Sequence, residues 1–225
     1  GAFFPSKIEF SQNIDDFDPM VLPTGGISFK HRHAINEGFN WNAGFSLLIW
    51  NQGLNQRHTW IDPNGNTEVY YWKQAAYFPV LQVPVSVNKY FKIADRNWLN
   101  VELGGSLNWF PFWFGMDEVL IESSNADPNM GGMSYGPNHN SIVTPSGFAA
   151  IGYEHMLKSQ HTLGVNVFSS YSPFRSQGTI ESRVDGNTIY LIEQSQPFIY
   201  SGIEMRFGFA TNREKLQVKA IGKND

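Results

Sequence analysis

The sequence predicts an all-β fold, an eight-stranded antiparallel up-and-down transmembrane β-barrel with long extracellular loops. The clearest evidence is residues 98–110, where Leu99, Val101 and Leu103 alternate with Asn100 and Glu102. A period of two is that of a β-strand. The segment is longer than the roughly 5 or 6 residues of an ordinary strand. It suits the about 9 to 11 residues that a tilted strand needs to cross lipid.

The same alternation recurs along the chain and predicts the remaining strands. The alternation is weaker in residues 20–32, 147–157 and 162–171, and the first segment, residues 4–10, is the least regular. An even total of eight is what a closed bacterial barrel requires. The predicted strands cover residues 4–10, 20–32, 38–52, 77–91, 98–110, 147–157, 162–171 and 198–209.

The links between these strands alternate in length, which predicts how the barrel is oriented. Outer-membrane barrels have short periplasmic turns and longer extracellular loops. Asn64-Gly65 and Asp185-Gly186 lie inside two long links and are typical hairpin turns, so we expect strand pairs that continue above the membrane. The short links are 33–37, 92–97 and 158–160, and the long links are 53–76, 111–145 and 172–197. We therefore expect a barrel over residues 1–210 and a polar periplasmic tail over residues 211–225.

Composition excludes several classes of protein. Charged residues make up 16% of the chain, and the net charge is −4, which disfavours a nucleic-acid partner. There are no cysteines, so disulfides and thiolate metal sites are impossible. No run of apolar residues is long enough for a membrane-spanning helix. We expect no cofactor.

Aromatic residues gather near the ends of the predicted strands. Rings at this position are typical of the girdles that β-barrels place at the two lipid–water boundaries. Scattered aromatics in a soluble core are the alternative. The predicted girdle consists of Phe39, Trp41, Trp50, Tyr77, Tyr90, Trp98, Trp109, Tyr171, Phe207 and Phe209.

Six charged residues fall on the polar faces of the strands, which line the lumen if the apolar faces meet lipid. The lumen of an eight-stranded barrel is just wide enough to be filled by side chains. Unpaired charges there are costly, so we expect an internal salt-bridge network that fills the lumen. A gated proton or ion path is the alternative. The six residues are Lys30, Arg32, Glu102, Glu154, Glu204 and Arg206.

The histidines do not form a recognisable catalytic site. His31 and His33 lie near a short turn, and a deacylase-like serine two residues beyond either is missing, because Ala34 and Ile35 occupy this stretch. We expect no enzymatic activity. The other histidines lie beside a short turn (His155, His161) or in long loops without spaced metal-ligating partners (His58, His139).

Six motifs lie on the predicted strands: Gly25-Gly26-Ile27-Ser28-Phe29, Phe45-Ser46-Leu47-Leu48-Ile49, Val80-Leu81-Gln82-Val83-Pro84-Val85, Leu103-Gly104-Gly105-Ser106-Leu107, Gly147-Phe148-Ala149-Ala150-Ile151-Gly152-Tyr153-Glu154 and Gly202-Ile203-Glu204-Met205-Arg206-Phe207. Together they resemble the small outer-membrane β-barrel proteins of Bacteroidota, a group that includes OmpA-like and PorT-like eight-stranded barrels. The resemblance covers most of residues 20 to 210. It implies an eight-stranded barrel in the outer membrane and no particular activity. The tail departs from the commoner pattern, in which the final strand ends the protein.

We therefore expect an integral outer-membrane scaffold or accessory subunit of a larger secretion, transport or assembly complex. Its expected partners are outer-membrane lipid, lipopolysaccharide and other outer-membrane proteins. Large exposed rings supply much of the energy of protein interfaces. The alternative is that the loop rings pack on one another and close the top of the barrel. The predicted loops contain Trp60, Tyr70, Tyr71, Trp72, Trp113, Tyr135 and Tyr190. The alternatives are a small pore, a lipid-modifying enzyme, and a soluble lipocalin-like barrel with its apolar faces turned inward.

Overall fold

The computed structural model describes residues 1–5, 9–10, 17–36, 38–61, 64–110, 119–123, 134–137, 143–184 and 187–209. These residues form twelve strands and no helix long and apolar enough to span a membrane. The strands are β1 (Ala2–Pro5), β2 (Glu9–Phe10), β3 (Phe17–Met20), β4 (Thr24–Asn36), β5 (Phe39–Ile61), β6 (Thr67–Ala94), β7 (Asn97–Trp109), β8 (Val119–Ser123), β9 (Ser134–Pro137), β10 (Val143–Met156), β11 (Thr162–Val184) and β12 (Asn187–Gly208). The predicted tail, residues 211–225, lies outside the described residues.

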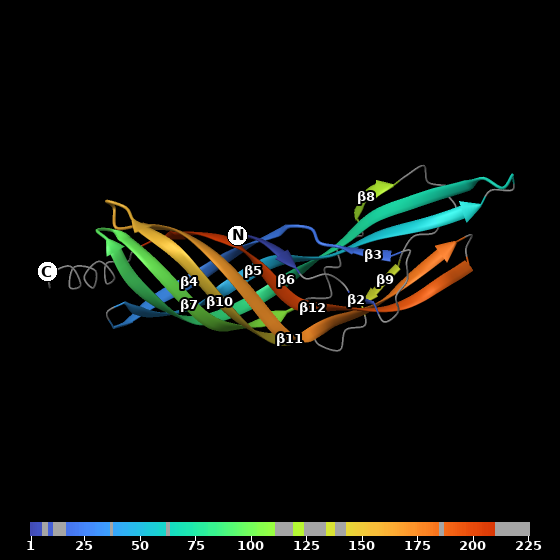
Figure 1. The fold of residues 1–225 in the computed structure, drawn as a ribbon. Helices are drawn as coiled ribbons and strands as arrows, with labels where there is room; N and C mark the ends of the chain where they lie inside the picture. Colours follow the sequence, from blue (N-terminus) through green and yellow to red (C-terminus); the bar gives the residue numbers. More distant parts are fainter. Residues whose placement is uncertain are drawn as a thin grey trace.

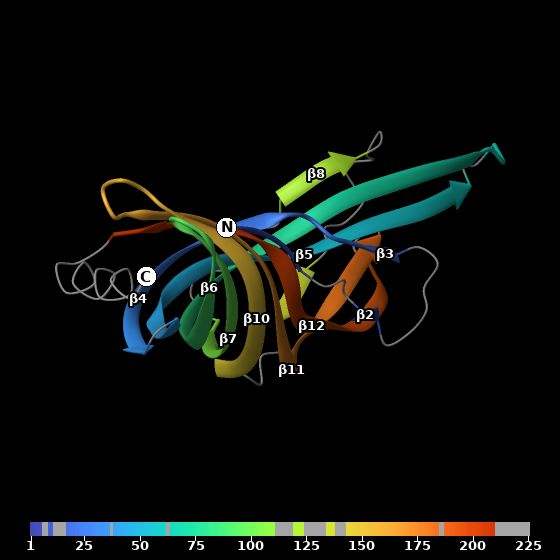
Figure 2. The same ribbon diagram turned by 60° about the vertical axis from the view of Figure 1, so that its left-hand side comes forward.

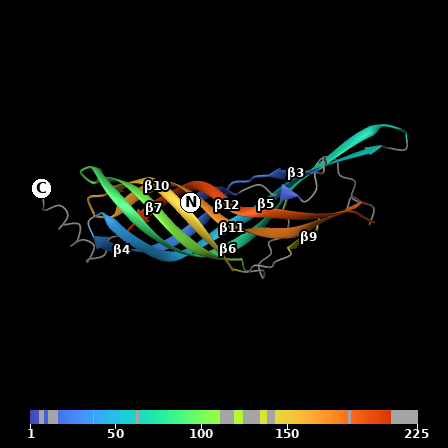
Figure 3. The same cartoon turned by 60° about the horizontal axis from the view of Figure 1, so that its bottom comes forward.

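Eight of the strands close into a ring, which confirms the predicted all-β barrel architecture. The order around the ring is β1, β4, β5, β6, β7, β10, β11 and β12, and β12 pairs with β1 to close it. Every neighbouring pair is antiparallel. The strands run obliquely around the barrel, as Figure 3 shows.

The first ring strand differs from the prediction. We expected one strand over residues 4–10, but β1 ends at Pro5, and Glu9 and Phe10 form the separate strand β2. β1 also begins halfway along the barrel, because Ala2 pairs with Ile203 of β12 and with Gly25 of β4. The N-terminus accordingly lies near the middle of the molecule in Figure 1.

At one end of the barrel, the links between the described strands are tight turns. The link from β4 to β5 contains Gly38 at φ 73°, the link from β6 to β7 contains Arg96 at φ 66°, and the link from β10 to β11 contains Gln160 at φ 66°. A residue with positive φ matches the twist of a tight hairpin. These are the links predicted to be short.

At the opposite end, two hairpins extend beyond the ring (Figures 1 and 2). β5 and β6 stay paired up to Ile61 and Thr67, around a turn that contains Gly65 at φ 85°. β11 and β12 stay paired up to Val184 and Asn187. Both predicted hairpin extensions are therefore confirmed, and the predicted turn residues Asp185-Gly186 lie outside the described residues. The shorter strands add to these arms: β3 pairs with β5, β8 with β6, β9 with β11, and β2 with β12.

The two faces of the barrel wall have opposite chemistry. Apolar side chains cover the outside and are exposed, whereas polar side chains face inward and are buried. The outer set includes Ile27, Phe29, Phe45, Val83, Val85, Val87, Leu99, Val101, Leu103, Leu107, Ile151, Val165, Val167, Ile203 and Met205. The inner set includes Asn42, Ser46, Gln82, Ser86, Asn88, Asn100, Glu102, Ser106, Asn108, Ser146, Glu154, Asn166 and Ser170.

Candidate functional site

The barrel interior is the candidate site, and its half nearest the tight turns holds a cluster of ion pairs. Glu102 of β7 is fully buried and binds the guanidinium of Arg206. Its Oε1 lies 3.5 Å from the Nζ of Lys30 and accepts a hydrogen bond of 2.5 Å from Ser86. Glu204 joins the same group, since its carboxylate accepts from Arg206 Nε at 2.7 Å and lies 3.6 Å from Lys30.

A second ion pair lies closer to the turns. Arg32 of β4 donates two parallel hydrogen bonds of 2.9 Å to Glu154 of β10. The guanidinium also lies 5.0 Å from the centre of the Tyr90 ring, and the Tyr90 hydroxyl donates to Glu154 at 3.3 Å. A bidentate Arg–carboxylate pair is among the stronger polar contacts in proteins. It ties together strands on opposite sides of the lumen.

The six charged residues predicted to face the lumen are thus brought together in the structure. They carry three positive and three negative charges, which balance. Alternation along each strand identified their common face. The particular pairs, such as Arg32 with Glu154, follow only from how the sheet closes.

Above the charges lies a layer of amides and hydroxyls. Gln82 donates to Asn108 at 2.6 Å and to the Tyr200 hydroxyl at 2.9 Å. Asn108 also donates to Ser146 at 3.0 Å, and Ser146 lies 2.7 Å from the Ser106 hydroxyl. These buried groups therefore satisfy one another instead of remaining open for solvent.

A cluster of aromatic and aliphatic side chains closes the interior at the end of the extended hairpins. Trp50 is 1% exposed and stacks on Phe198, with ring centres 4.4 Å apart. Its indole Nε1 donates to Gln196 at 3.0 Å. This cluster was not among the sequence predictions. The strand alternation nevertheless places Trp50, Phe198 and Tyr200 on the same faces of β5 and β12 as the inward polar residues. The cluster consists of Phe3, Leu48, Trp50, Val80, Phe198 and Tyr200, with Phe78, Phe110 and Phe168 packed against it.

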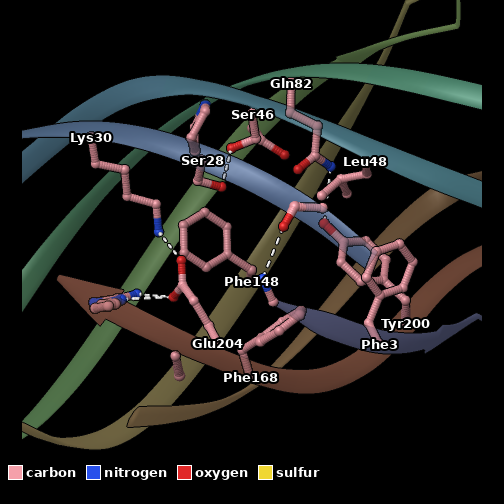
Figure 4. Close-up of a pocket in the computed structure, with 16 residues that line it drawn as sticks. Phe3, Ser28, Lys30, Ser46, Leu48, Gln82, Phe148, Phe168, Tyr200 and Glu204 are labelled. Carbon is pink, nitrogen blue, oxygen red and sulfur yellow. Dashed lines mark hydrogen bonds and ion pairs between the residues drawn. The ribbon is translucent and has the colours of Figure 1, made fainter. Parts of the chain in front are cut away.

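Between the aromatic and charged layers lies a small pocket of about 70 Å³, which is partly open to solvent. Figure 4 shows Lys30 and Glu204 at one end of the pocket, Phe3 and Tyr200 at the other, and the Phe148 ring between them. The polar groups in it already bind one another, so the pocket offers no free charge of one sign to recognise a ligand.

Replacing Trp50 with phenylalanine tests the aromatic cluster. The smaller ring would fill most of the site, and the side-chain Oε1 of Gln196 would lose its indole donor. A buried acceptor left without its donor costs roughly 1–2 kcal/mol of stability. Urea unfolding, followed by the fluorescence of the remaining tryptophans, measures the change. A Trp109→Phe variant is the control, because Trp109 lies on the outer wall; equal losses in both variants would contradict the assigned role of Trp50.

The structure places the ten predicted girdle rings on both faces of the barrel wall. Six of its members are exposed on the outer side: Phe39, Trp41, Trp109, Tyr171, Phe207 and Phe209. Trp50 and Tyr90 were predicted wrongly, because both rings point into the barrel. Trp98 is half-buried and in phase with the inward Asn100, and Tyr77 is half-buried beside Asn51. A position near a strand end places a ring near the rim of the barrel, but the two-residue alternation decides whether the ring points outward or inward.

Among the histidines whose side chains the structure describes, none takes part in the interior network. His33 lies against Trp41, and His161 lies against Phe207 and Phe209 at the end of the tight turns. His155 contacts Asn97 at 2.8 Å. His139 lies outside the described residues. Within the part of the chain that the structure describes, no three His, Asp or Glu side chains gather closely enough to hold a metal ion.

Comparison with known proteins identifies no family. No protein-family model matches the chain, and no curated protein sequence matches it. Among solved structures, the chain is similar to the outer membrane protein OprG from Pseudomonas aeruginosa, with 11% identity and a TM-score of 0.34 over 93% of this chain and 95% of that chain. A likeness at this level does not identify a function.

Proposed function

We propose that this protein is an integral outer-membrane β-barrel with a closed interior, which serves as a scaffold or accessory subunit of a larger envelope assembly and has no catalytic activity. The inverted distribution of polarity carries this proposal. Leu103 and Val167 are each 57% exposed, whereas Glu102 and Asn108, on the opposite face of the wall, are fully buried. Soluble proteins seldom expose so large a continuous apolar surface.

The soluble lipocalin-like alternative requires the reverse arrangement. A barrel that binds an apolar ligand in water has its apolar faces inward and its charged faces outward. Here the outward faces of β6, β7, β10 and β11 are rows of aliphatic and aromatic residues. Lipid is the solvent that suits this wall.

The asymmetry of the two ends favours the outer membrane. Tight turns at one end and long extensions at the other match periplasmic turns and extracellular loops. The resemblance of the strand motifs to small Bacteroidota outer-membrane barrels agrees with this location. On this basis we place the tight turns in the periplasm and the extended hairpins outside the cell.

The pore alternative is less favoured because two separate clusters of side chains fill the interior at different levels. The ion-pair cluster around Glu102 crosses the lumen near the tight turns, and the cluster around Trp50 crosses it at the other end. We therefore expect no stepwise conductance when the protein is reconstituted in planar bilayers, whereas a regular conductance would favour the pore.

The extended hairpins support the scaffold role. The β5–β6 hairpin projects beyond the barrel and carries β3 and β8 on its edges. The backbones of Trp60, Tyr70, Tyr71 and Trp72 lie in this hairpin, whereas Trp113 lies outside the described residues. A long arm beyond the membrane gives a partner protein both backbone edges and side chains to bind.

Spin labels on single-cysteine variants test the membrane location. We expect a paramagnetic reagent dissolved in the lipid to shorten the spin relaxation time of labels at Leu103 and Val85. We expect labels at Glu102 and Ser86 to be protected from this reagent. Because the chain has no cysteine, each label has a single position. Water-exposed labels at Leu103 and Val85 in reconstituted vesicles would refute the proposal.

The scaffold role is tested by purification from native membranes in mild detergent, comparing the full chain with a shortened one. The shortened chain lacks residues 56–72 and joins the paired residues Asn55 and Lys73 through an Asn-Gly turn, which preserves the register of β5 and β6. We expect the same outer-membrane protein to accompany the full chain in repeated purifications and to be lost with the shortened one. Intact lipid A mass in expressing cells is expected, and altered lipid A would favour the enzyme alternative.

A further inference from the structure

The outer face of the barrel wall carries few basic side chains, and they lie at one end. Along the described wall, short of the extended hairpins, the outward positions contain no carboxylate. Lys89 pairs with Phe39 at the start of β5, and His155 pairs with Asn97 at the start of β7, so both are close to the tight turns. The outward basic residues of the described wall are His31 and His33 of β4, Lys89 of β6 and His155 of β10.

The side chain of Lys89 runs along the wall toward the tight turns. Its Nζ lies 4.0 Å from the centre of the Phe39 ring, which is a cation–π contact, and beside Gly38 of the turn between β4 and β5. The aliphatic stem therefore covers apolar wall while the ammonium reaches the end of the barrel. Lysines adopt this arrangement where hydrocarbon meets the headgroups of a membrane.

An imidazole lies on the other side of the same aromatic rings. His33 of β4 pairs with Trp41 of β5, and the centres of their rings are 5.7 Å apart. Trp41 is two residues from Phe39 and is exposed on the same face, so two rings separate the imidazole from the ammonium of Lys89. We call this group on the outer face of β4, β5 and β6 the boundary patch, and it consists of His33, Phe39, Trp41 and Lys89.

The charge of Lys89 has no counter-charge among the described residues. Neither Lys89 nor His33 pairs with a carboxylate in the part of the chain that the structure describes. The cations of the interior differ, because Lys30, Arg32 and Arg206 each bind a glutamate. A cation at the edge of hydrocarbon attracts an anion more strongly than a cation in water does. In a membrane, the anions at this level are the phosphates of lipid headgroups.

We propose that the boundary patch binds the headgroup phosphate of an anionic phospholipid in the leaflet that surrounds the tight turns. This inference rests on the proposed function, because it requires lipid against the wall. Lys89 contributes the positive charge, and an imidazole N–H of His33 donates to a phosphate oxygen. The rings of Phe39 and Trp41 contact the glycerol and the first carbons of the acyl chains, since aromatic side chains suit the depth at which lipid meets water.

The opposite end of the wall lacks such a patch in the described residues. Trp109 of β7 and Tyr171 of β11 are exposed there and supply aromatic rings. Their outward neighbours on the wall, which include Leu107, Val143 and Ser169, carry no charge. An anionic headgroup beside this end therefore meets rings and aliphatic side chains without a cation. The wall thus distinguishes the two leaflets by charge, and the boundary patch is the part that selects an anionic lipid.

Native mass spectrometry of the full chain in mild detergent, with equal amounts of phosphatidylglycerol and phosphatidylcholine, tests the proposal. We expect the unsubstituted chain to retain one phosphatidylglycerol molecule in several-fold excess over phosphatidylcholine, whose choline cancels the charge of its phosphate. Lys89→Gln is expected to lower this retention about fivefold, because a lysine at an anionic lipid surface contributes about 1 kcal/mol. Lys89→Arg is expected to preserve it, since a guanidinium also binds phosphate. Lys89→Gln combined with His33→Leu is expected to abolish the preference.

Arg57→Gln is the matched control, because it removes the same charge from an exposed position on the β5–β6 hairpin, away from the wall. Loss of phosphatidylglycerol from Lys89→Gln but not from Arg57→Gln supports the proposal. Equal retention of the two lipids by the unsubstituted chain, or equal losses in Lys89→Gln and Arg57→Gln, overturns it, and the proposed function stands if spin labels at Leu103 still report lipid. If those labels report water, the membrane location itself fails.

Discussion

Replacing Leu103 with arginine is expected to destabilise the folded protein in lipid by about 2–4 kcal/mol. Leu103 lies near the middle of β7 on the outer face of the wall and is 57% exposed. In water, a charged residue at so exposed a position would change stability by no more than about 0.5 kcal/mol. In lipid it faces hydrocarbon, and the guanidinium cannot be solvated. Urea unfolding in phospholipid vesicles measures the difference.

Leu99→Arg is the matched control for this experiment. Leu99 lies on the same strand and the same face, but next to the turn at Arg96, where a long side chain can reach the lipid headgroups. We expect a loss of about 0–1 kcal/mol there. Equal and small losses at both positions would indicate a water-exposed wall and contradict the membrane location.

Replacing Glu102 with glutamine is expected to cost about 3 kcal/mol or more. Glu102 is fully buried and binds both Lys30 and Arg206, so its neutralisation leaves an excess positive charge inside the barrel. Removing one partner of a buried ion pair typically costs about 3–5 kcal/mol. Because Glu204 still pairs with Lys30 and Arg206 in the variant, we expect a loss of stability near the lower end of this range. Unfolding in urea measures it.

Combining Glu102→Gln with Lys30→Met distinguishes charge balance from shape. The double variant is neutral again inside the barrel, so we expect it to regain at least half of the stability lost in Glu102→Gln. Groups in direct contact typically couple by about 0.5–3 kcal/mol. Strictly additive losses would show that the cluster contributes through packing, not through its balance of charges.

Much of the fold could be predicted because strand alternation is a local property. Each residue of β7 from Leu99 to Trp109 points to the face opposite its neighbours, whatever the rest of the chain does. Lys30, Glu102 and Arg206 could therefore be assigned to the inner face from the sequence. The turns could be predicted for a similar reason, since Asn64-Gly65 favours the positive φ that a tight hairpin needs.

The errors arose where a local cue competed with this alternation. Trp50 and Tyr90 lie near strand ends, as girdle residues do, yet both are in phase with the inner polar residues. Trp50 is stabilised inside by Gln196 and Phe198, which come from a strand far away in the sequence. No local pattern reveals that such partners exist.

Most of the strands, their two faces and the alternation of short and long connections can be predicted from the sequence alone, because they depend on neighbouring residues. Only the closed sheet shows which inward residues meet and that rings close one end of the interior. Those features depend on the stagger with which the sheet closes on itself. The stagger sets which residues lie opposite one another across the lumen. It cannot be derived from the two-residue alternation along a single strand.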